Sequence, residues 1–347
     1  MTRLRRTLLL FGVLGLLAFA AMNLIAYRQA HAMLHFSSGA PRTAKPESLN
    51  LWQKLQVILR GVNIPRPITT LPANVLGAEC REVRIPSSNG ITLSAWYCPA
   101  ESDHGLVLLF HGYSSEKSGL RHEARALLDL GYSVLVVDFR GSGGSSESYT
   151  TTGYLEAEDV VAAVNFARAN LAPARLILYG QSMGAAAALR AVSTLGVRPD
   201  AMIVEAVFDE LLTTVRHRFE AMGLPVFPAA NLLVFWGGQQ VGFDGFAHRP
   251  VEYAAHITCP ILFLHGSDDP RARIAEGRRV YAAVPGKKSF YEFAGSRHEP
   301  SVVHFESEWK SAVGDFLRES LSVPANSVGV ADQRPDAISA LATTCLG

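Results

Sequence analysis

The sequence predicts an α/β protein with a mostly parallel sheet that is covered by helices on both faces. From residue 79 onward, short apolar runs typical of strands alternate with longer segments of helical periodicity. The runs are continuously apolar, as expected of strands that are buried on both faces. Glycine and chemically reactive residues follow several runs directly. Because sheets of this kind carry their chemistry at the carboxyl ends of the strands, we expect the functional site there.

Composition indicates a folded protein with no nucleic-acid partner. The chain has 347 residues, of which 48% are hydrophobic and 18% charged, and its formal net charge is +1. A hydrophobic content of this size is typical of a globular domain rather than a disordered chain. Binding to nucleic acid requires clustered Lys and Arg, whereas this chain has balanced charges.

Residues 1–36 predict a membrane anchor or a signal segment. Arg3, Arg5 and Arg6 precede an uncharged, mostly apolar stretch over residues 7–27. A stretch of about 20 such residues crosses a bilayer, and the basic residues ahead of it place the rest of the chain outside the cytoplasm. The first interpretation is a retained single-pass anchor. The alternative is cleavage at a small-residue site over 18–20 or 30–32, which would give a secreted or periplasmic protein.

Residues 37–78 predict a linker and one short amphipathic helix. The segment 37–47 has the composition of a tether, and Ser48 is the expected N-cap of the helix. One face of that helix carries six apolar side chains, those of Leu51, Trp52, Leu55, Ile58, Leu59 and Val62. We expect this stripe to pack on the main domain, and the alternative is that it lies on the membrane surface.

The main domain is expected over residues 79–320. It opens with a hairpin that brings Cys80 and Cys98 opposite each other, as either a disulfide or two free thiols. A disulfide would require an oxidising compartment. Further strands and helices follow in alternation, with strands expected at 105–110, 132–138, 176–179, 201–207, 261–264 and 289–293, and helices at 116–130, 154–170 and after the strand 176–179. Residues 321–347, rich in Ala and Ser, predict a loose tail.

An insertion interrupts the alternation at about residues 209–256. It is longer than an ordinary connection, and such insertions are often functional lids. Its centre, residues 221–243, is uncharged and rich in large apolar side chains. We expect the insertion to form a small core of its own and an apolar wall over the site.

The most informative stretch is Gly180-Gln181-Ser182-Met183-Gly184, which fits the G-x-S-x-G nucleophile elbow. In such a turn the serine hydroxyl stands clear of the chain between a strand and a helix, and the two glycines allow strand and helix to approach closely. The backbone N–H of Met183, at the start of the helix, would face an oxyanion formed beside Ser182. A nucleophilic serine also needs a base and a carboxylate that orients the base.

Candidates for both follow later strands, and the resulting order of motifs resembles the α/β-hydrolase family, particularly its serine esterase, lipase and aminopeptidase-like members. The resemblance covers about residues 79–320. It depends on five landmarks, which are His111-Gly112, Asp138-Phe-Arg-Gly-Ser-Gly, the elbow, His265-Gly-x-x-Asp269 and Gly295-x-x-His298. The landmarks occur in the family's order, which is more specific than any one of them.

The resemblance implies a site residue by residue. Ser182 would be the nucleophile, His298 the general base and Asp269 the carboxylate, with the backbone N–H groups of Tyr113 and Met183 as the oxyanion hole. Other candidates are Asp268, Glu205 and Asp209 for the carboxylate and His304 for the base. No cofactor is implied, and no metal site, because no His and carboxylate pair has the spacing of a zinc ligand set.

The expected activity is hydrolysis of a small-molecule ester with an apolar acyl or alkyl group, through an acyl-enzyme. The alternatives are a peptidase or acyltransferase with the same triad, and a catalytically silent binding module. His111 and His265 are expected to brace loops, as are Asp138 and Arg140.

Overall fold

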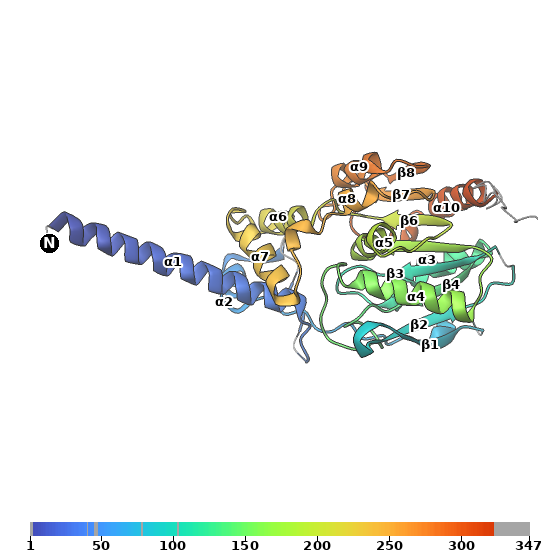
Figure 1. Ribbon diagram of the computed structural model, residues 1–347, viewed down its shortest axis with the longest axis horizontal. Helices are drawn as coiled ribbons and strands as arrows, with labels where there is room; N and C mark the ends of the chain where they lie inside the picture. The colour runs from blue at the N-terminus through green and yellow to red at the C-terminus, as the bar shows by residue number, and fades with distance from the viewer. Residues whose placement is uncertain (1–2, 40, 45–47, 78, 103, 323–347) are drawn as a thin grey trace, which may run out of the picture.

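The computed structural model describes residues 3–39, 41–44, 48–77, 79–102 and 104–322, and most of the expected tail lies outside these residues. An eight-stranded sheet forms the centre of the main domain, and a long N-terminal helix, α1 (Arg3–Leu34), projects from one end of the molecule (Figure 1). The helices of the insertion lie between the projecting helix and the sheet.

The sheet confirms the predicted fold class. Its strand order is β1-β2-β4-β3-β5-β6-β7-β8. β1 and β2 are antiparallel to each other, β2 is also antiparallel to β4, and β3 to β8 run parallel to one another. The strands are β1 (Arg81–Pro86), β2 (Thr92–Cys98), β3 (Leu106–Phe110), β4 (Ser133–Val137), β5 (Leu176–Gln181), β6 (Ala201–Glu205), β7 (Ile261–Gly266) and β8 (Lys288–Phe293).

Helices cover both faces of this sheet, which explains why its central strands are mainly apolar. On one face lie α4 (Glu156–Asn170), α5 (Met183–Thr194), α8 (Pro250–Ala254) and α9 (Ile274–Ala283). On the other lie α3 (Arg121–Asp129), which follows the short 3₁₀ helix η4 (Lys117–Leu120), and α10 (Glu306–Leu321). Every residue of β3 and β6 is therefore buried.

A disulfide joins Cys80 and Cys98. In the hairpin of β1 and β2, Arg81 lies opposite Tyr97, so the next pair outward consists of the two cysteines. Their Cα atoms are 4.2 Å apart. Of the alternatives that the hairpin left open, the structure therefore has the bridge, whereas Cys259 is a free thiol.

Thiol titration of the unreduced, denatured protein is expected to find two free thiols among the four cysteines, because Cys80 and Cys98 are bonded to each other. The control is the same titration after reduction, which should find four. Four thiols before reduction would show that the hairpin is not bridged.

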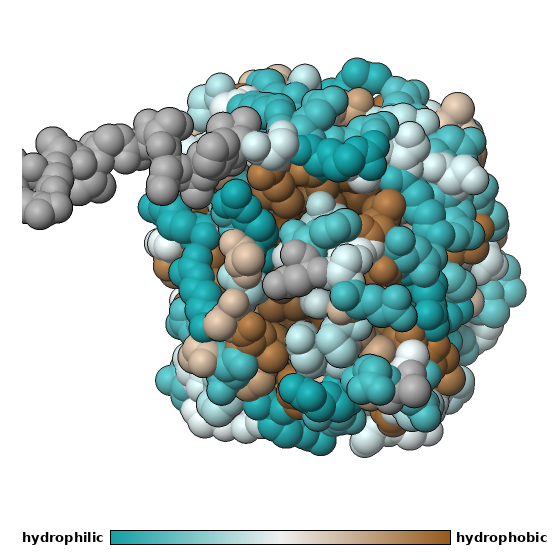
Figure 2. Space-filling model, turned by 90° about the vertical axis from the view of Figure 1, so that its right-hand side faces the viewer, coloured by the Kyte–Doolittle hydropathy of each residue, from teal (hydrophilic) through white to brown (hydrophobic). Residues whose placement is uncertain are grey.

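Helix α1 is long and apolar enough to cross a membrane. Its most apolar window has a mean hydropathy of 2.4, and none of that window is buried against the rest of the protein. It is the one such helix among the residues that the structure describes. At the opposite end of the molecule the surface is mainly hydrophilic, with hydrophobic residues among the polar ones (Figure 2). The exposed apolar side chains of α1 therefore form an apolar surface at one end of the molecule only.

The insertion folds into α6 (Leu211–Met222), α7 (Ala229–Val241) and the short 3₁₀ helix η5 (Gly245–Ala247) ahead of α8. We call α6 and α7 the lid helices. They enclose a small hydrophobic core of their own that includes Val215, Leu233 and Val234. Ala30 of α1 also belongs to this core, so the end of the N-terminal helix and the lid helices form one packed unit.

The short helix α2 (Leu51–Arg60) differs from expectation in two respects. Its N-cap is Asn50 rather than Ser48, because Asn50 and Gln53 form a reciprocal capping box. The expectation that its apolar stripe packs on the main domain is wrong for most of the stripe: Leu51 is 86% exposed and Trp52 65%, and Leu55 and Leu59 are exposed as well. The helix is held from its other face by α1 and the end of α6, through hydrogen bonds that involve Gln29 and Lys54.

Candidate active site

The elbow serine has the strained backbone that the motif predicts. Ser182 lies between β5 and α5 with φ 51° and ψ −110°, a conformation that non-glycine residues rarely adopt. A Cβ added at Gly180 would lie 2.5 Å from the carbonyl oxygen of Gly184, and one added at Gly184 would lie 2.1 Å from that of Phe110. The turn therefore needs glycine at both positions.

The candidate oxyanion donors lie beside this serine. Met183 is the first residue of α5, so its N–H has no partner within the helix. Gly112 follows β3 and borders the elbow, because a Cβ built on it would lie 3.6 Å from the Cβ of Ser182. Tyr113 comes next in the chain. Over the residues that the structure describes, neither the Met183 N–H nor the Tyr113 N–H has an acceptor, so both are available to an oxyanion.

His298 and Asp269 form a hydrogen bond of 2.7 Å between Nδ1 and Oδ2. The Asp269 side chain is buried, and its other oxygen accepts the backbone N–H groups of Arg271 and Ala272. Burial alone would raise the pKa of Asp269, but the hydrogen bond and charge of His298, with the two N–H donors, outweigh it and hold this pKa below its usual value. The carboxylate is thus ionised at neutral pH, and its contact with Nδ1 leaves Nε2 of His298 free to accept a proton.

The other candidate residues have different partners. Asp268 is exposed and accepts a hydrogen bond from Ser267. Asp209 pairs with Arg279 at 2.7 Å. His304 is exposed, at the end of the 3₁₀ turn η6 (Ser301–Val303), whereas His298 is the histidine bound to Asp269.

The strand-end loops are tied to one another, and Glu205 is their common attachment point. The backbone N–H of Ser182 donates to the Glu205 carbonyl at 2.8 Å. The Glu205 carboxylate accepts the backbone N–H of Ser301, three residues after His298, at 2.8 Å, and the hydroxyl of Tyr179 at 2.6 Å. Asp268 N–H donates to the Ser296 carbonyl at 3.0 Å. Glu205 therefore links the elbow to the histidine loop.

Sequence reasoning considered Glu205 only as an acid and did not identify this linking role. It also gave no role to Glu123 of α3, whose two carboxyl oxygens are buried without a hydrogen-bond partner among the described residues. Burial, followed by the negative charge of Glu205, raises the pKa of Glu123 to about 8. Glu123 and Glu205 are 82 residues apart in the sequence, so no local sequence pattern identifies their carboxyl groups as neighbours.

The raised pKa of Glu123 predicts a pH-dependent stability. A carboxyl group with a folded pKa above its unfolded pKa of 4.5 contributes stability below that pH and loses it as the pH rises towards 8. Glu123→Gln cannot ionise. We therefore expect its melting temperature, relative to that of the wild type, to increase from pH 5 to pH 8, which corresponds to a free-energy difference on the order of a few kcal/mol.

The matched control is Glu308→Gln, at an exposed position of α10, which should leave the pH dependence of the melting temperature unchanged. Parallel curves for Glu123→Gln and the wild type over this pH range would show that Glu123 ionises normally in the folded protein.

The remaining strand-end residues brace loops, as expected. His111 accepts the Phe139 N–H at Nε2 and donates from Nδ1 to the Gly112 carbonyl, and burial lowers its pKa. Asp138 is paired with buried Lys117 at 2.5 Å and accepts the N–H of Gly144. These contacts fix the loops around Tyr113 rather than supply a second reactive group.

Two further residues act in the same way. His265 donates to the carbonyl of Ala272, in the loop that carries Asp269, and burial lowers its pKa. Arg140 forms a buried ion pair with Asp159 of α4 at 2.8 Å. Both contacts hold strand-end loops against the helices beside them.

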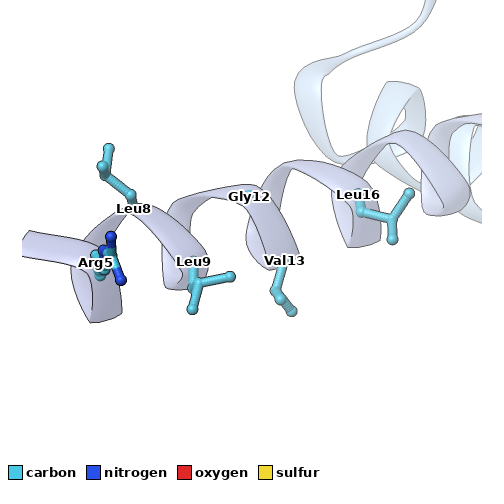
Figure 3. A pocket seen from close by; sticks show the side chains of 6 residues that line it. All are labelled: Arg5, Leu8, Leu9, Gly12, Val13 and Leu16. Atoms are coloured by element: carbon cyan, nitrogen blue, oxygen red, sulfur yellow. The ribbon is translucent and has the colours of Figure 1, made fainter. Parts of the chain in front are cut away.

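A shallow hollow on α1 is not a second site. Six residues line it, and all of them belong to the projecting part of one helix, with no other element facing them (Figure 3). They are Arg5, Leu8, Leu9, Gly12, Val13 and Leu16. A binding site requires convergent groups from more than one direction, so this surface is that of an apolar helix.

The sheet order and the elbow define this protein as an α/β hydrolase. A family model described as serine aminopeptidase, S33, matches residues 101–210. The structure of an esterase from Pyrococcus furiosus, Pf2001, is similar with a TM-score of 0.62 and 26% identity, over 74% of this chain and 99% of that one. The chain has the α/β-hydrolase fold and is similar to members of that family that are named as esterase, lipase and aminopeptidase.

Curated relatives include uncharacterized proteins and lipases. An uncharacterized protein of Bacillus subtilis (strain 168), YqkD, is 26% identical over 67% of this chain and 77% of its own length. The lysophosphatidylserine lipase ABHD12 of Danio rerio is 27% identical over 64% of this chain and 61% of its own length, and that of Mus musculus is 28% identical over 57% and 50%. The match thus spans between half and two thirds of the ABHD12 proteins.

Proposed function

We propose that this protein is a serine hydrolase that cleaves carboxylic esters through an acyl-enzyme intermediate. Ser182 is the nucleophile, His298 the general base and Asp269 the carboxylate that orients it. The observation that carries the proposal is the 2.7 Å hydrogen bond between His298 and Asp269, in loops attached to the strained elbow of Ser182. Nucleophile, base and carboxylate are the three groups that this chemistry needs.

The reaction proceeds in two halves. The Ser182 hydroxyl attacks the ester carbonyl while its proton passes to Nε2 of His298, and the Tyr113 and Met183 N–H groups stabilise the oxyanion. The C–O bond then breaks, the alcohol leaves with the proton from His298, and the acyl group stays on Ser182. Water next attacks the acyl group and gives a proton to His298. The bond between the acyl carbon and Ser182 Oγ then breaks, His298 returns the proton to Ser182 Oγ, and the carboxylic acid is released.

The substrate that we propose is a small-molecule ester with an apolar acyl or alkyl group. The lid helices support this choice, because their inner side is mainly apolar. The names of two relatives, an esterase and a lysophosphatidylserine lipase, agree with it. The family model is named for an aminopeptidase, so amide cleavage is the outcome that a test must distinguish.

We further propose that α1 anchors the protein with its catalytic domain outside the cytoplasm. Arg3, Arg5 and Arg6 precede the apolar span, as on the cytoplasmic side of a membrane helix. The disulfide between Cys80 and Cys98 is consistent with an oxidising compartment. Cleavage at residues 30–32 would remove side chains that pack against α7, which favours a retained helix.

The test combines covalent labelling with turnover. A fluorophosphonate probe should label the full-length protein in detergent, and label should be absent from Ser182→Ala. A series of p-nitrophenyl esters should be hydrolysed faster than aminoacyl p-nitroanilides. Faster cleavage of the amides would identify a peptidase, and a folded protein that is neither labelled nor active would identify a binding module.

A further inference from the structure

A narrow cavity lies between the end of α1 and the lid helices. Its volume is about 60 Å³. Three residues of α1, Ala30, Met33 and Leu34, line it together with Leu233 and Gly237 of α7, where the two helices meet. Figure 1 shows α7 beside this end of α1, between the projecting part of the helix and the sheet. The cavity is therefore built jointly by the N-terminal helix and the insertion.

The lining of the cavity suits an alkyl chain with a polar end. Most of the lining residues are apolar, and Arg218 of α6 is the charged residue among them. Its guanidinium lies 5.1 Å from the centre of the Tyr113 ring, so the charged part of the lining lies at Tyr113, and three threonines add polar groups. A charged or polar head group of an apolar chain would thus be accommodated beside Tyr113.

Tyr113 connects this cavity to the candidate nucleophile. It lines the cavity and is also the residue after Gly112, which borders the elbow of Ser182. An ester carbonyl held at Ser182 by the Tyr113 N–H would therefore contact a residue that also lines the cavity.

The end of α1 is fixed in this position. Ala26, Ala30 and Leu34 recur every fourth residue on one face and are buried, whereas the helix before Ala26 is largely exposed. The backbone of Leu34 accepts the Thr150 N–H at 2.8 Å, and that of Met33 accepts the Tyr113 hydroxyl at 2.5 Å. The wall is thus ordered by contacts with the main domain.

The last third of α1, from Asn23 onward, also pairs with α7. Trp236 donates from its indole N–H to Asn23 at 3.0 Å, and Gln240 donates to the carbonyl of Tyr27 at 3.0 Å. The first part of α1 therefore has exposed apolar side chains, and the last turns of the same continuous helix line the cavity. Removing it would open the cavity on one side.

We propose that the last turns of α1 are a wall of the acyl-binding site and determine the length of acyl chain that the enzyme accepts. The proposal rests on the ester hydrolase function proposed above. The acyl chain lies against Ala30, Met33 and Leu34 of α1, beside the contact of these residues with α7, and its carbonyl is at Ser182. The flexible side chain of Met33 allows the narrow cavity to widen around the chain.

The test is the chain-length profile of the full-length protein in detergent, measured as kcat/KM for p-nitrophenyl acetate, butyrate, octanoate and laurate. Ala30→Leu narrows the cavity from α1 and should lower the octanoate-to-acetate ratio at least tenfold, since one methylene in such a pocket is worth about tenfold or more. Leu34→Ala widens it and should raise the laurate-to-butyrate ratio. The matched control is Ala21→Leu, at an exposed position of the same helix, which should keep the wild-type profile.

A second variant covers the case in which Ala30→Leu fails to fold, as judged by its melting temperature. A Cβ at Gly237 would lie 3.9 Å from Ala30 and Leu34, which is ordinary contact, and leucine has a higher helix propensity than glycine in a helix interior. Gly237→Leu should therefore fold and shorten the preferred chain as well.

The experiment distinguishes failure of this proposal from failure of the proposed hydrolase function. Wild-type protein that hydrolyses none of the esters and takes no fluorophosphonate label contradicts the hydrolase itself. An active wild type with unchanged profiles in folded Ala30→Leu and Leu34→Ala shows that α1 is no wall of the site. If the chain-length profile changes in Gly237→Leu but not in the folded α1 variants, the acyl chain contacts α7 and not α1. That result also overturns the proposal.

Discussion

Replacing Ser182 with Ala is expected to lower kcat for ester hydrolysis by about 10⁴-fold or more, because no acyl-enzyme can form without the hydroxyl. The fold should be kept, since the strain of φ 51° at this position is no greater for Ala, and the backbone N–H of residue 182 still donates to the Glu205 carbonyl. The measurement is steady-state hydrolysis of a p-nitrophenyl ester, with the melting temperature as the check on folding.

Ser311→Ala is the matched control for this change. Ser311 lies on the exposed side of α10 and its hydroxyl donates to Asp315, so its loss should leave kcat within twofold of the wild type. A Ser182→Ala protein that keeps a tenth or more of the wild-type rate would mean that the nucleophile is another residue, and the assignment of His298 and Asp269 would end with it.

Asp269→Asn is expected to lower kcat by roughly 10⁴-fold, the loss seen when an amide replaces a triad carboxylate. The Asn side chain keeps the size of Asp269, and its oxygen still accepts the N–H groups of Arg271 and Ala272. Its NH₂ group would then face Nδ1 of His298, which must become an acceptor. The proton moves to Nε2, where the base has to receive one from Ser182.

The adjacent carboxylate offers a control one residue away. Asp268→Asn removes the same charge at an exposed position whose partner is Ser267, and we expect kcat to change by less than about threefold, because an exposed charge is screened by water. If Asp268→Asn were the damaging change and Asp269→Asn the harmless one, the two carboxylates would exchange roles. Equal and small effects would exclude both from the mechanism.

The fold class was predictable because its signals are local. A strand that is buried on both faces is mainly apolar. β3 is apolar throughout in the sequence, and β4 and β6 are apolar except for Ser133 and Glu205 at their ends. The elbow is local as well, since the close approach of strand and helix excludes a Cβ at Gly180 and Gly184. These features depend on residues within a few positions of each other.

Features that depend on distant partners were not predictable. The apolar stripe of α2 has the periodicity of a packed helix, yet Leu51 and Trp52 face outward because α1 contacts the opposite side of α2. The alanines of α1 look like those of any membrane helix, and nothing near Ala30 in the sequence indicates that Leu233 and Val234 pack around it.

The sequence by itself determined the strands, their alternation with helices, and the serine turn, because side-chain polarity and glycine act on neighbouring residues. Only the tertiary structure decided that His298 bonds to Asp269 rather than Asp268, that Glu205 joins the serine and histidine loops, and that α1 closes one side of the lid cavity. The physical reason is that these contacts join residues far apart in the chain, and burial and hydrogen-bond geometry select such partners only once the sheet has assembled.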